Sequence, residues 1–448
     1  MSLADRLPWI DALSTTTAIA AAMLLWPVPG PPATPAEVTA RAAVVVGVAL
    51  LAFYYNDLYD FDVPHETGDV FLRLCRAVGV TAILLAATYA IFPGLVVTST
   101  AVSHALLLML AAVLATRVAV YALAKHPPFA ERIVIMGGGA LAADLAAQIG
   151  TRQDVPLVVV GFLGDPAMTP TPGPRLGAYA DVDEVVRRHR PDRIVVAMPD
   201  RRGNLPVAQL LACRFRGVAV EDGALTWERV TRRLPVESLT PSALIFGDGF
   251  RVSRPRQALQ RALSLAVAVT GLVLAAPLGA LIAIAITLES RGPVFFVQER
   301  VGLGGRSFRL VKFRTMRVGD ETCDGVWRRD NASRVTPLGR VLRKYRIDEL
   351  PQFLNILRGD MNLVGPRPEM ASNVATFTAS IPFYGLRHEV RPGLTGWAQV
   401  KAGYSMTTEE VTRKLCYDLY YVKHASLAFD LRLLVDTVKF VLSGKRPG

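Results

Sequence analysis

Long apolar segments occupy the first quarter of the 448-residue chain. Four of them, at about 9–28, 38–55, 72–92 and 101–124, are each about 18–24 residues long. At a rise of about 1.5 Å per residue, a helix of this length crosses a hydrocarbon core of roughly 30 Å. The pattern therefore predicts a bundle of four transmembrane helices over residues 1–124.

Basic residues near these segments predict the orientation of the bundle. Arg73 and Arg76 lie at the start of the third segment, and Lys125 and Arg132 follow the fourth, whereas the loop at 92–100 has no charge. Loops rich in Lys and Arg stay on the cytoplasmic side of a membrane. Both ends of the bundle are therefore expected in the cytoplasm.

The pattern changes after the bundle to alternating short strands and helices, over residues 125–250. A strand at 133–136 leads into Gly137, Gly139 and Ala142, which fit G-x-G-x-x-A at the start of a helix. This alternation predicts a Rossmann-like module with a parallel sheet. The glycine turn is typical of a nucleotide site. A scaffold without a ligand is the alternative, because the stretch at 153–156 supplies no clear acidic residue at the end of a second strand.

A further apolar segment, at 262–288, is uncharged over its whole length. It is long enough to cross a bilayer, but basic residues flank both of its ends, and Pro277 interrupts its middle. Arg254, Arg256 and Arg261 precede it and Arg291 follows it. These features favour a helix that enters the membrane, bends at Pro277 and returns to the cytoplasmic side. A plain fifth span is the alternative.

Composition agrees with a membrane protein. Hydrophobic residues make up 51% of the chain and charged residues 20%, against about 25% charge in an average soluble domain. The net charge of +12 is uneven, because residues 1–124 contain five Arg and eight Asp or Glu. Anionic lipids, nucleic acids and phosphorylated substrates are the partners that a basic surface attracts. The four Cys lie far apart and predict neither a disulfide framework nor a zinc site.

The final third contains the chemistry-bearing residues. Asp348 and Glu349 are adjacent carboxylates among Arg343, Lys344 and Arg346, just before a helix that Pro351 can start. Two carboxylates among several cations suit Mg²⁺ with a diphosphate, because Mg²⁺ prefers oxygen ligands and Arg binds phosphate oxygens. A surface cluster of ion pairs is the alternative for an isolated pair of this kind.

Four ordered motifs accompany this pair, and together they resemble the bacterial sugar transferases, which are polyprenyl-phosphate sugar-1-phosphate transferases. The motifs are KFRTM at 312–316, RIDELPQ at 346–352, GDMNLVGPRPE at 359–369 and RPGLTGWAQV at 391–400. The resemblance covers about 258–448, including the apolar segment, which is a re-entrant membrane helix in that family. Four spans and a Rossmann-like module in front are typical of its large members.

The resemblance implies a two-step transfer. A carboxylate attacks the β-phosphate of a UDP-sugar and releases UMP, and polyprenyl (undecaprenyl) phosphate then takes the sugar 1-phosphate from the enzyme. The resemblance also implies that Asp348 is the nucleophile and that Glu349 is a metal ligand or base, with both carboxylates near Mg²⁺. The phosphate-binding cations fall on Lys312, Arg343 and Arg367. For Arg367, a structural ion pair with Asp360 or Glu369 remains an alternative, and for Lys312 a surface charge at a strand edge. Asp360 and Asn362 are expected to brace their loop.

One departure from the family leaves the sugar open. Smaller members often continue the fourth motif with an Asn-Gly-Arg turn, where this chain reads WAQVKAGYS. This variant resembles a subgroup associated with exopolysaccharide synthesis. Nearby tyrosines could stack on a base or sugar. An aromatic belt at the membrane interface is the preferred interpretation. The tyrosines are Tyr404, Tyr417, Tyr420 and Tyr421.

The expected organisation has four parts: the bundle (1–124), the Rossmann-like module (125–250), the basic flank with the re-entrant helix (251–291) and a small, mostly helical catalytic domain (292–448). The expected partners are a UDP-sugar, polyprenyl phosphate and the lipid bilayer, with no nucleic acid and with a homodimer left open. The expected location is the bacterial inner membrane, with the catalytic domain cytoplasmic. Two alternatives remain: a membrane-anchored nucleotide-sugar oxidoreductase or epimerase, although residues 142–260 contain no Tyr-x-x-x-Lys, and a non-catalytic scaffold for glycan export.

Overall fold

The computed structural model describes most of the chain, with short gaps, and divides it into two compact units, Met1–Thr226 and Trp227–Gly448. The described residues are 3–25, 34–56, 58–59, 67–93, 99–124, 130–152, 155–164, 173–201, 204–250, 253–317, 334–402 and 407–443.

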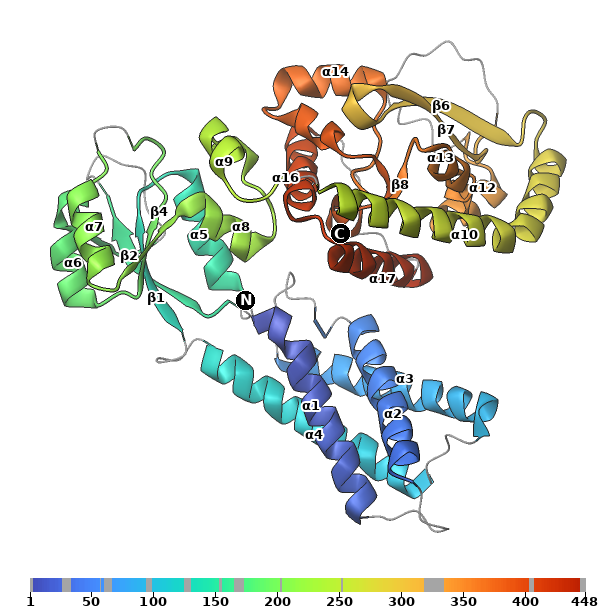
Figure 1. The fold of residues 1–448 in the computed structure, drawn as a ribbon, viewed down its shortest axis with the longest axis horizontal. Coiled ribbons are helices and arrows are strands. Elements are labelled where there is room, and N and C mark those ends of the chain that lie inside the picture. The colour runs from blue at the N-terminus through green and yellow to red at the C-terminus, as the bar shows by residue number, and fades with distance from the viewer. Residues whose placement is uncertain are drawn as a thin grey trace. The chain divides into compact units, whose positions relative to one another are not determined.

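Four helices form the predicted N-terminal bundle (Figure 1). They are α1 (Leu3–Leu25), α2 (Pro35–Tyr55), α3 (Thr67–Ile91) and α4 (Ser99–Ala124). Helix α1 packs along α4, and α2 packs along α3, around a core that includes Phe53, Leu74 and Met109. Among the described residues, α2, α3 and α4 contain segments long and apolar enough to cross a membrane, and so does the later helix α10.

A buried ion pair joins the first and last helices of the bundle. The Arg117 guanidinium lies 2.5 Å from the Asp11 carboxylate, and both side chains are almost fully buried. Arg117 also lies over the Tyr59 ring, 5.3 Å from its centroid. A charge inside an apolar bundle is costly unless it is paired, so this pair favours one alignment of α1 with α4.

A five-stranded parallel sheet follows, which confirms the predicted Rossmann-like module. Its strand order is β3-β2-β1-β4-β5, with a crossover on each side of β1. The strands are β1 (Glu131–Met136), β2 (Leu157–Leu163), β3 (Arg175–Gly177), β4 (Arg193–Val196) and β5 (Ala219–Asp222), and the helices are α5 (Ala140–Thr151), α6 (Val182–His189), α7 (Val207–Phe215) and α8 (Gly223–Thr231).

The glycine turn of this module lies where the sequence predicts it. Gly137 has a φ of 129°, and a Cβ there would lie 2.6 Å from the Ala197 carbonyl oxygen, so only glycine fits. Strand β2 ends at Leu163, so its end lies later in the chain than the stretch at 153–156, where an acidic residue would have indicated a nucleotide site. The next acidic residue, Asp165, lies outside the described residues.

The second unit is mostly helical, as predicted, with one hairpin and one short parallel strand pair. The hairpin is β6 (Phe295–Val301) with β7 (Ser307–Phe313), and the pair is β8 (Asn362–Val364) with β9 (Gly393–Thr395). The helices are α9 (Pro241–Phe246), α10 (Arg254–Glu289), α12 (Pro337–Lys344), α13 (Gln352–Arg358), α14 (Ala371–Ser380), α15 (Trp397–Lys401), α16 (Thr408–His424) and α17 (Leu427–Ser443), and short 3₁₀ turns include η5 (Ile347–Glu349) and η6 (Tyr384–Glu389).

Residues just after the sheet belong to this second unit. Glu228 accepts hydrogen bonds from Lys423 Nζ at 2.7 Å and pairs with His424 Nε2 at 2.5 Å, both on α16. Leu234 and Val236 pack in an apolar cluster with residues of η6 and α16. The segment 227–250 is therefore part of the packing of the C-terminal unit.

Helix α10 is a single helix of 36 residues with Pro277 inside it. Figure 1 shows that the helix bends, so that its later part turns away from the line of its first part. A straight helix of this length would extend about 54 Å. A proline inside a helix removes a backbone hydrogen bond and is a common cause of such a bend.

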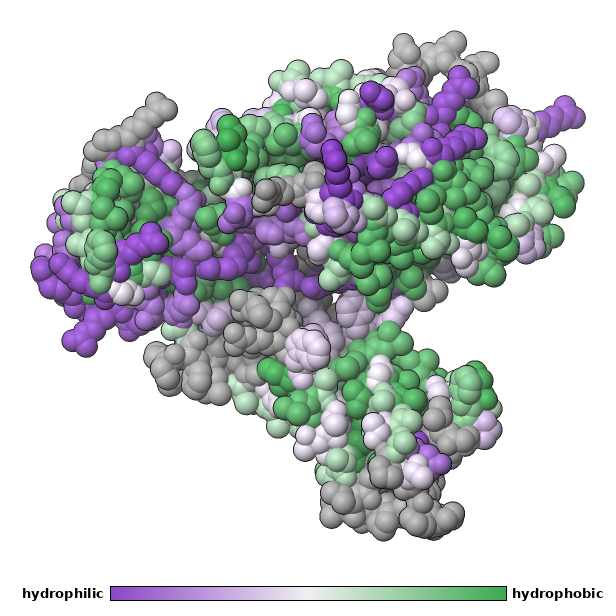
Figure 2. All heavy atoms as spheres, viewed as in Figure 1, coloured by the Kyte–Doolittle hydropathy of each residue, from purple (hydrophilic) through white to green (hydrophobic). Residues whose placement is uncertain are grey.

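Both halves of α10 are attached to the same unit. In the first half, Arg261 donates to the Met361 carbonyl oxygen at 2.9 Å, and Ser264 Oγ accepts from the Leu363 N–H at 3.1 Å. In the second half, Ile282 and Ile286 pack in an apolar cluster with residues of β7 and α12. Apolar side chains are exposed along the helix, where Figure 2 shows a green surface. They include Val273, Leu274, Leu278, Leu281, Ile284 and Leu288.

Two of the tyrosines assigned to an aromatic belt or to stacking lie in the core instead. Tyr417 and Tyr421 are buried, four residues apart on α16, on the face that packs against Trp397 and Phe429. Tyr420 is partly buried against His424 and the same Phe429. Tyr404 lies outside the described residues.

Candidate active site

The carboxylate dyad lies in a tight turn between α12 and α13. Thr336 caps α12, accepting a hydrogen bond from the Gly339 N–H at 2.9 Å. At Gly339 a Cβ would lie 2.2 Å from the Thr315 carbonyl oxygen, so glycine lets α12 approach the segment after β7. Arg346 then takes a left-handed conformation with a φ of 53°, which ends α12 and turns the chain into η5. This turn buries Asp348 just before α13.

Asp348 is a buried carboxylic acid among cations. Burial raises its pKa to about 6, and the neighbouring Glu349 carboxylate acts in the same direction. Lys312, Arg343 and Arg367 oppose this rise. Asp348 therefore lies within electrostatic range of all three predicted phosphate-binding cations, which come from β7, α12 and the loop after β8.

Among these cations, Lys312 lowers the pKa of Asp348 most. Burial lowers the pKa of Lys312 to about 8, and Asp348 is the strongest influence in the opposite direction. Its ammonium also lies over the Phe296 ring, 5.0 Å from the centroid. A partly buried lysine beside a carboxylate differs from the simple strand-edge surface charge that the sequence left open.

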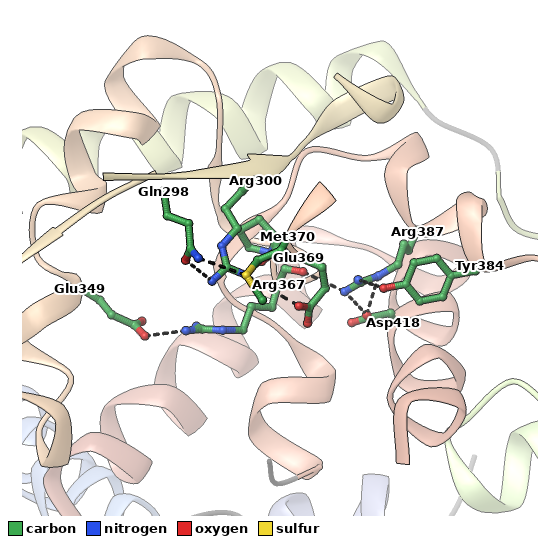
Figure 3. A network of polar contacts seen from close by, with 10 residues as sticks. Gln298, Arg300, Glu349, Arg367, Glu369, Met370, Tyr384, Arg387 and Asp418 are labelled. Carbon is green, nitrogen blue, oxygen red and sulfur yellow. Dashed lines mark hydrogen bonds and ion pairs between the residues drawn. The ribbon is translucent and has the colours of Figure 1, made fainter. Parts of the chain in front are cut away.

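Glu349 is held as an anion by two arginines. Burial alone would raise its pKa, but Arg367 and Arg346 outweigh this effect, and its pKa is lowered. Glu349 Oε1 accepts from Arg367 Nη2 at 2.9 Å (Figure 3). The same oxygen lies 3.4 Å from Arg346 Nη1. Glu349 is thus an ion-pair partner of Arg367, which ties Arg367 directly to the dyad.

The remaining predicted residues lie around the dyad. Arg343 is exposed and donates from Nε to Thr315 Oγ1 at 2.9 Å. Asp360 accepts from Asn355 Nδ2 at 3.1 Å, while Asn362 lies 3.5 Å from Arg261 Nη1. These contacts agree with the predicted bracing roles of Asp360 and Asn362.

Arg387 and Asp418 are buried residues that the sequence analysis missed. Arg387 donates to Asp418 Oδ2 from Nη2 at 2.7 Å and from Nε at 3.1 Å, and to the Tyr384 hydroxyl at 2.8 Å. A further bond, from Arg387 Nη2 to the Arg367 carbonyl oxygen at 2.8 Å, fixes the loop that presents Arg367 (Figure 3). Burial alone would lower the pKa of Arg387, but Asp418 reverses this, so Arg387 remains charged.

The dyad fits Mg²⁺ only in one binding mode. Among the described residues, no group of three or more His, Cys, Asp or Glu could hold a metal ion. Mg²⁺, however, is often bound by one or two carboxylates with substrate phosphates and water. Asp348 and Glu349 supply the two carboxylates, so the site fits a metal that shares its ligands with a diphosphate.

A carboxylate in this setting can attack an anionic phosphorus centre. The cations from β7, α12 and the loop after β8 neutralise the negative charge that would otherwise repel the nucleophile. The paired Glu349 keeps its charge beside Asp348, because Arg346 and Arg367 both lie at its Oε1 oxygen.

Comparison with known proteins agrees with this geometry. The family model described as bacterial sugar transferase matches residues 255–444, and a model described as a CoA-binding domain matches residues 55–205. A UDP-N-acetylgalactosamine-undecaprenyl-phosphate N-acetylgalactosaminephosphotransferase of Aeromonas hydrophila is 43% identical over 218 residues, which are 48% of this chain and 51% of that protein.

Two further relatives carry related names. An undecaprenyl-phosphate glucose phosphotransferase of Komagataeibacter xylinus is 34% identical over 324 residues, 69% of this chain and 59% of that protein. A UDP-glucose:undecaprenyl-phosphate glucose-1-phosphate transferase of Caulobacter vibrioides is 44% identical over 186 residues, 41% of this chain and 70% of that protein. The chain spans between half and three fifths of the length of the first two. The chain covers 70% of the Caulobacter transferase at 44% identity, and the bacterial sugar transferase model matches its residues 255–444, so the chain belongs to the bacterial sugar transferases.

Proposed function

We propose that this protein transfers a sugar 1-phosphate from a UDP-sugar to undecaprenyl phosphate and releases UMP, as the first membrane step in the synthesis of an exopolysaccharide or another surface glycan. The observation that carries the proposal is the buried Asp348, within range of Lys312, Arg343 and Arg367. The names of the relatives support the same donor and acceptor classes.

In the first step, an oxygen of Asp348 attacks the β-phosphorus of the UDP-sugar. The bond between that phosphorus and the bridging oxygen breaks, and its electron pair leaves with UMP. Lys312, Arg343 and Arg367 bind the phosphate oxygens and offset the charge of the approaching carboxylate. Bound Mg²⁺, held by Asp348 and Glu349, would supply further charge neutralisation at the phosphate oxygens.

In the second step, a phosphate oxygen of undecaprenyl phosphate attacks the sugar phosphate on Asp348. The bond from Asp348 to phosphorus breaks, and the carboxylate is restored. The product is an undecaprenyl-diphosphate sugar. Arg387 takes part only through position, because it holds the backbone of Arg367.

The proposal is tested with a panel of UDP-sugars and membrane-embedded protein. With undecaprenyl phosphate present, one or a few UDP-sugars should give continuous UMP release together with a labelled lipid product. Without the acceptor, UMP should reach one equivalent per enzyme and then stop. Release that always requires both substrates together would contradict the covalent intermediate, and no release from any UDP-sugar would contradict the proposed activity.

The topology of α10 forms part of the proposal. Both halves of α10 are attached to the C-terminal unit, which supports a helix that enters the inner membrane and returns to the cytoplasmic side. UDP-sugars are cytoplasmic, and the lipid phosphate lies at the headgroup level, so this topology brings both to the dyad. The basic flanks would lie at the anionic inner leaflet, worth about 1 kcal/mol per charge.

Pro277→Leu tests this topology. Leucine restores the missing backbone donor and straightens the helix, so a fraction of molecules should cross the membrane, and transfer activity should fall by about the same fraction. The measurement is labelling by a membrane-impermeant thiol reagent in otherwise cysteine-free protein, at Ser253→Cys before the helix and Glu299→Cys after it.

In the parent protein neither cysteine should react from outside the inner membrane. The Pro277→Leu protein should gain labelling at position 299 only. Leu278→Val is the matched control, because it changes an exposed apolar neighbour without removing the proline. External labelling of position 299 in the parent protein would show that α10 spans the membrane.

A further inference from the structure

A second group of cations lies beside the loop 367–369, which carries Arg367. Arg300, on β6, has its Nη1 atom 3.7 Å from Glu369 Oε2, and it donates from the same atom to the Pro368 carbonyl oxygen at 3.2 Å. Arg300 Nη2 donates to Gln298 Oε1 at 2.7 Å. Figure 3 shows Arg300 descending from β6 towards the loop that carries Arg367 and Glu369. Arg300 also acts electrostatically on Lys312.

Lys414 joins this group from α16. It lies one helical turn before Asp418, and side chains four residues apart share a helix face. Asp418 binds Arg387, which in turn binds the Arg367 backbone, so this face of α16 is directed at the loop 367–369. Glu369, Asp418 and Arg367 all lie within electrostatic range of the Lys414 ammonium.

The two carboxylates within electrostatic range of Lys414 are already engaged by arginines, Asp418 by Arg387 and Glu369 by Arg300. Arg367 pairs with Glu349, and Arg387 pairs with Asp418. Within the part of the chain that the structure describes, Lys414 has no ion pair or hydrogen bond, although it is half-buried. Burial lowers the pKa of its ammonium. A half-buried cation with this environment is stabilised when an anion binds beside it.

The geometry of displacement at phosphorus indicates which anion this is. In an in-line reaction the attacking and leaving oxygens lie on opposite sides of the phosphorus. Asp348 attacks from one side in the first step, so UMP leaves from the other. In the second step Asp348 is the leaving group, so the lipid phosphate must approach from the side that UMP vacated. One outer position therefore receives two phosphate monoesters in turn.

We propose that Lys414 and Arg300 form this outer phosphate subsite, which binds a phosphate monoester beside Arg367: the UMP phosphate in the first step and the undecaprenyl phosphate headgroup in the second. This inference rests on the proposed function, since it assigns the part of that site which Asp348, Glu349 and the three phosphate-binding cations leave open. Lys312 and Arg343 bind the transferred phosphate, next to Asp348. Lys414 and Arg300 bind the phosphate of UMP or of the lipid acceptor.

Lys414→Met tests the subsite, with UMP and uridine as the probes for its first occupant. The variant should weaken UMP binding about tenfold and leave uridine binding unchanged, because only UMP carries the phosphate. Lys414→Arg should restore most of the UMP affinity. Arg413→Met is the matched control, because it removes one positive charge from the adjacent, exposed position of α16. A structural role of Lys414 would change the binding of UMP and uridine alike.

The acceptor is tested on the same variants through the KM for undecaprenyl phosphate. Lys414→Met should raise this KM about tenfold while the lipid-independent burst of UMP keeps its amplitude, and Arg413→Met should leave it unchanged. A raised KM without weaker UMP binding, or the reverse, would overturn the shared subsite. If the parent protein is active and Lys414→Met has the same UMP affinity and the same KM, the inference about the subsite is wrong but the proposed function stands. Parent protein that releases no UMP at all would instead contradict the proposed function.

Discussion

Asp348→Asn should abolish sugar-phosphate transfer, with a loss of turnover of about 10⁴-fold or more. The asparagine amide keeps the shape of the side chain but offers no nucleophilic carboxylate oxygen. The measurement is intact-mass analysis after mixing with the UDP-sugar that the panel identifies. The parent protein should gain the mass of one sugar phosphate, whereas the variant should gain none and should release no burst of UMP.

The fold should survive this substitution, so the loss can be assigned to chemistry. Asp348 is only 7% exposed, and burial is the largest influence on its pKa, which is raised. The buried charge is therefore a cost to folding, and a neutral amide should leave thermal stability unchanged or higher.

Asp360→Asn is the matched control for this experiment. Asp360 lies in a neighbouring motif and accepts a hydrogen bond from Asn355, which an asparagine oxygen can also accept. This variant should form the adduct and retain most of its transfer activity. A retained rate in Asp348→Asn above about one hundredth of the parent rate would show that the nucleophile is another group.

The sequence could reveal the dyad because its chemistry is concentrated in short segments. Asp348, Glu349, Arg343 and Arg346 lie within seven consecutive positions, and a proline and a predicted helix follow them. Lys312 and Arg367 are distant from the dyad in the sequence, but each lies inside one of the ordered motifs, so the family resemblance could assign both to the site. The structure then gives Glu349 its two arginine partners, which no spacing in the sequence could indicate.

Arg387, Asp418, Arg300 and Lys414 escaped detection for a physical reason. They come from η6, α16 and β6, and they meet only after these elements pack on the loop that follows β8. An aspartate inside an amphipathic helix reads as a solvent-facing residue, whereas Asp418 is buried because Arg387 compensates its charge.

Local patterns also misled the interpretation in two places. Tyr417 and Tyr421 looked like interfacial aromatics, but their spacing of four residues places both on the buried face of α16. An acidic residue was expected at the end of a second strand near 153–156, but the second strand, β2, begins only at Leu157. Hydrophobic length predicted the helices of the bundle and the segment at α10. It could not reveal that both halves of α10 attach to the same unit, because that depends on contacts such as Arg261 with Met361.

Removal of Mg²⁺ should also stop the reaction almost completely. After exhaustive chelation, no burst of UMP should appear, and added Mg²⁺ should restore it, as should Mn²⁺, since both ions prefer octahedral oxygen ligands. The physical reason is that the dyad and the diphosphate are both anionic, and the cations Lys312, Arg343 and Arg367 offset only part of their repulsion. Full activity in the chelated protein would contradict a role for the metal.

The structure adds an expectation about how the metal binds. The described residues offer only two adjacent carboxylates, one of which already binds Arg346 and Arg367, so the protein alone should hold Mg²⁺ weakly. A UDP-sugar should strengthen Mg²⁺ binding at least about tenfold, because its phosphates supply the missing oxygen ligands. The parent protein keeps both carboxylates, so titration calorimetry with and without a UDP-sugar analogue whose diphosphate cannot be cleaved measures this difference. Glu349→Gln should raise the Mg²⁺ concentration needed for half-maximal UMP release, whereas Asp360→Asn should not. Tight Mg²⁺ binding to the protein without a nucleotide would show that further ligands complete the site independently of the substrate.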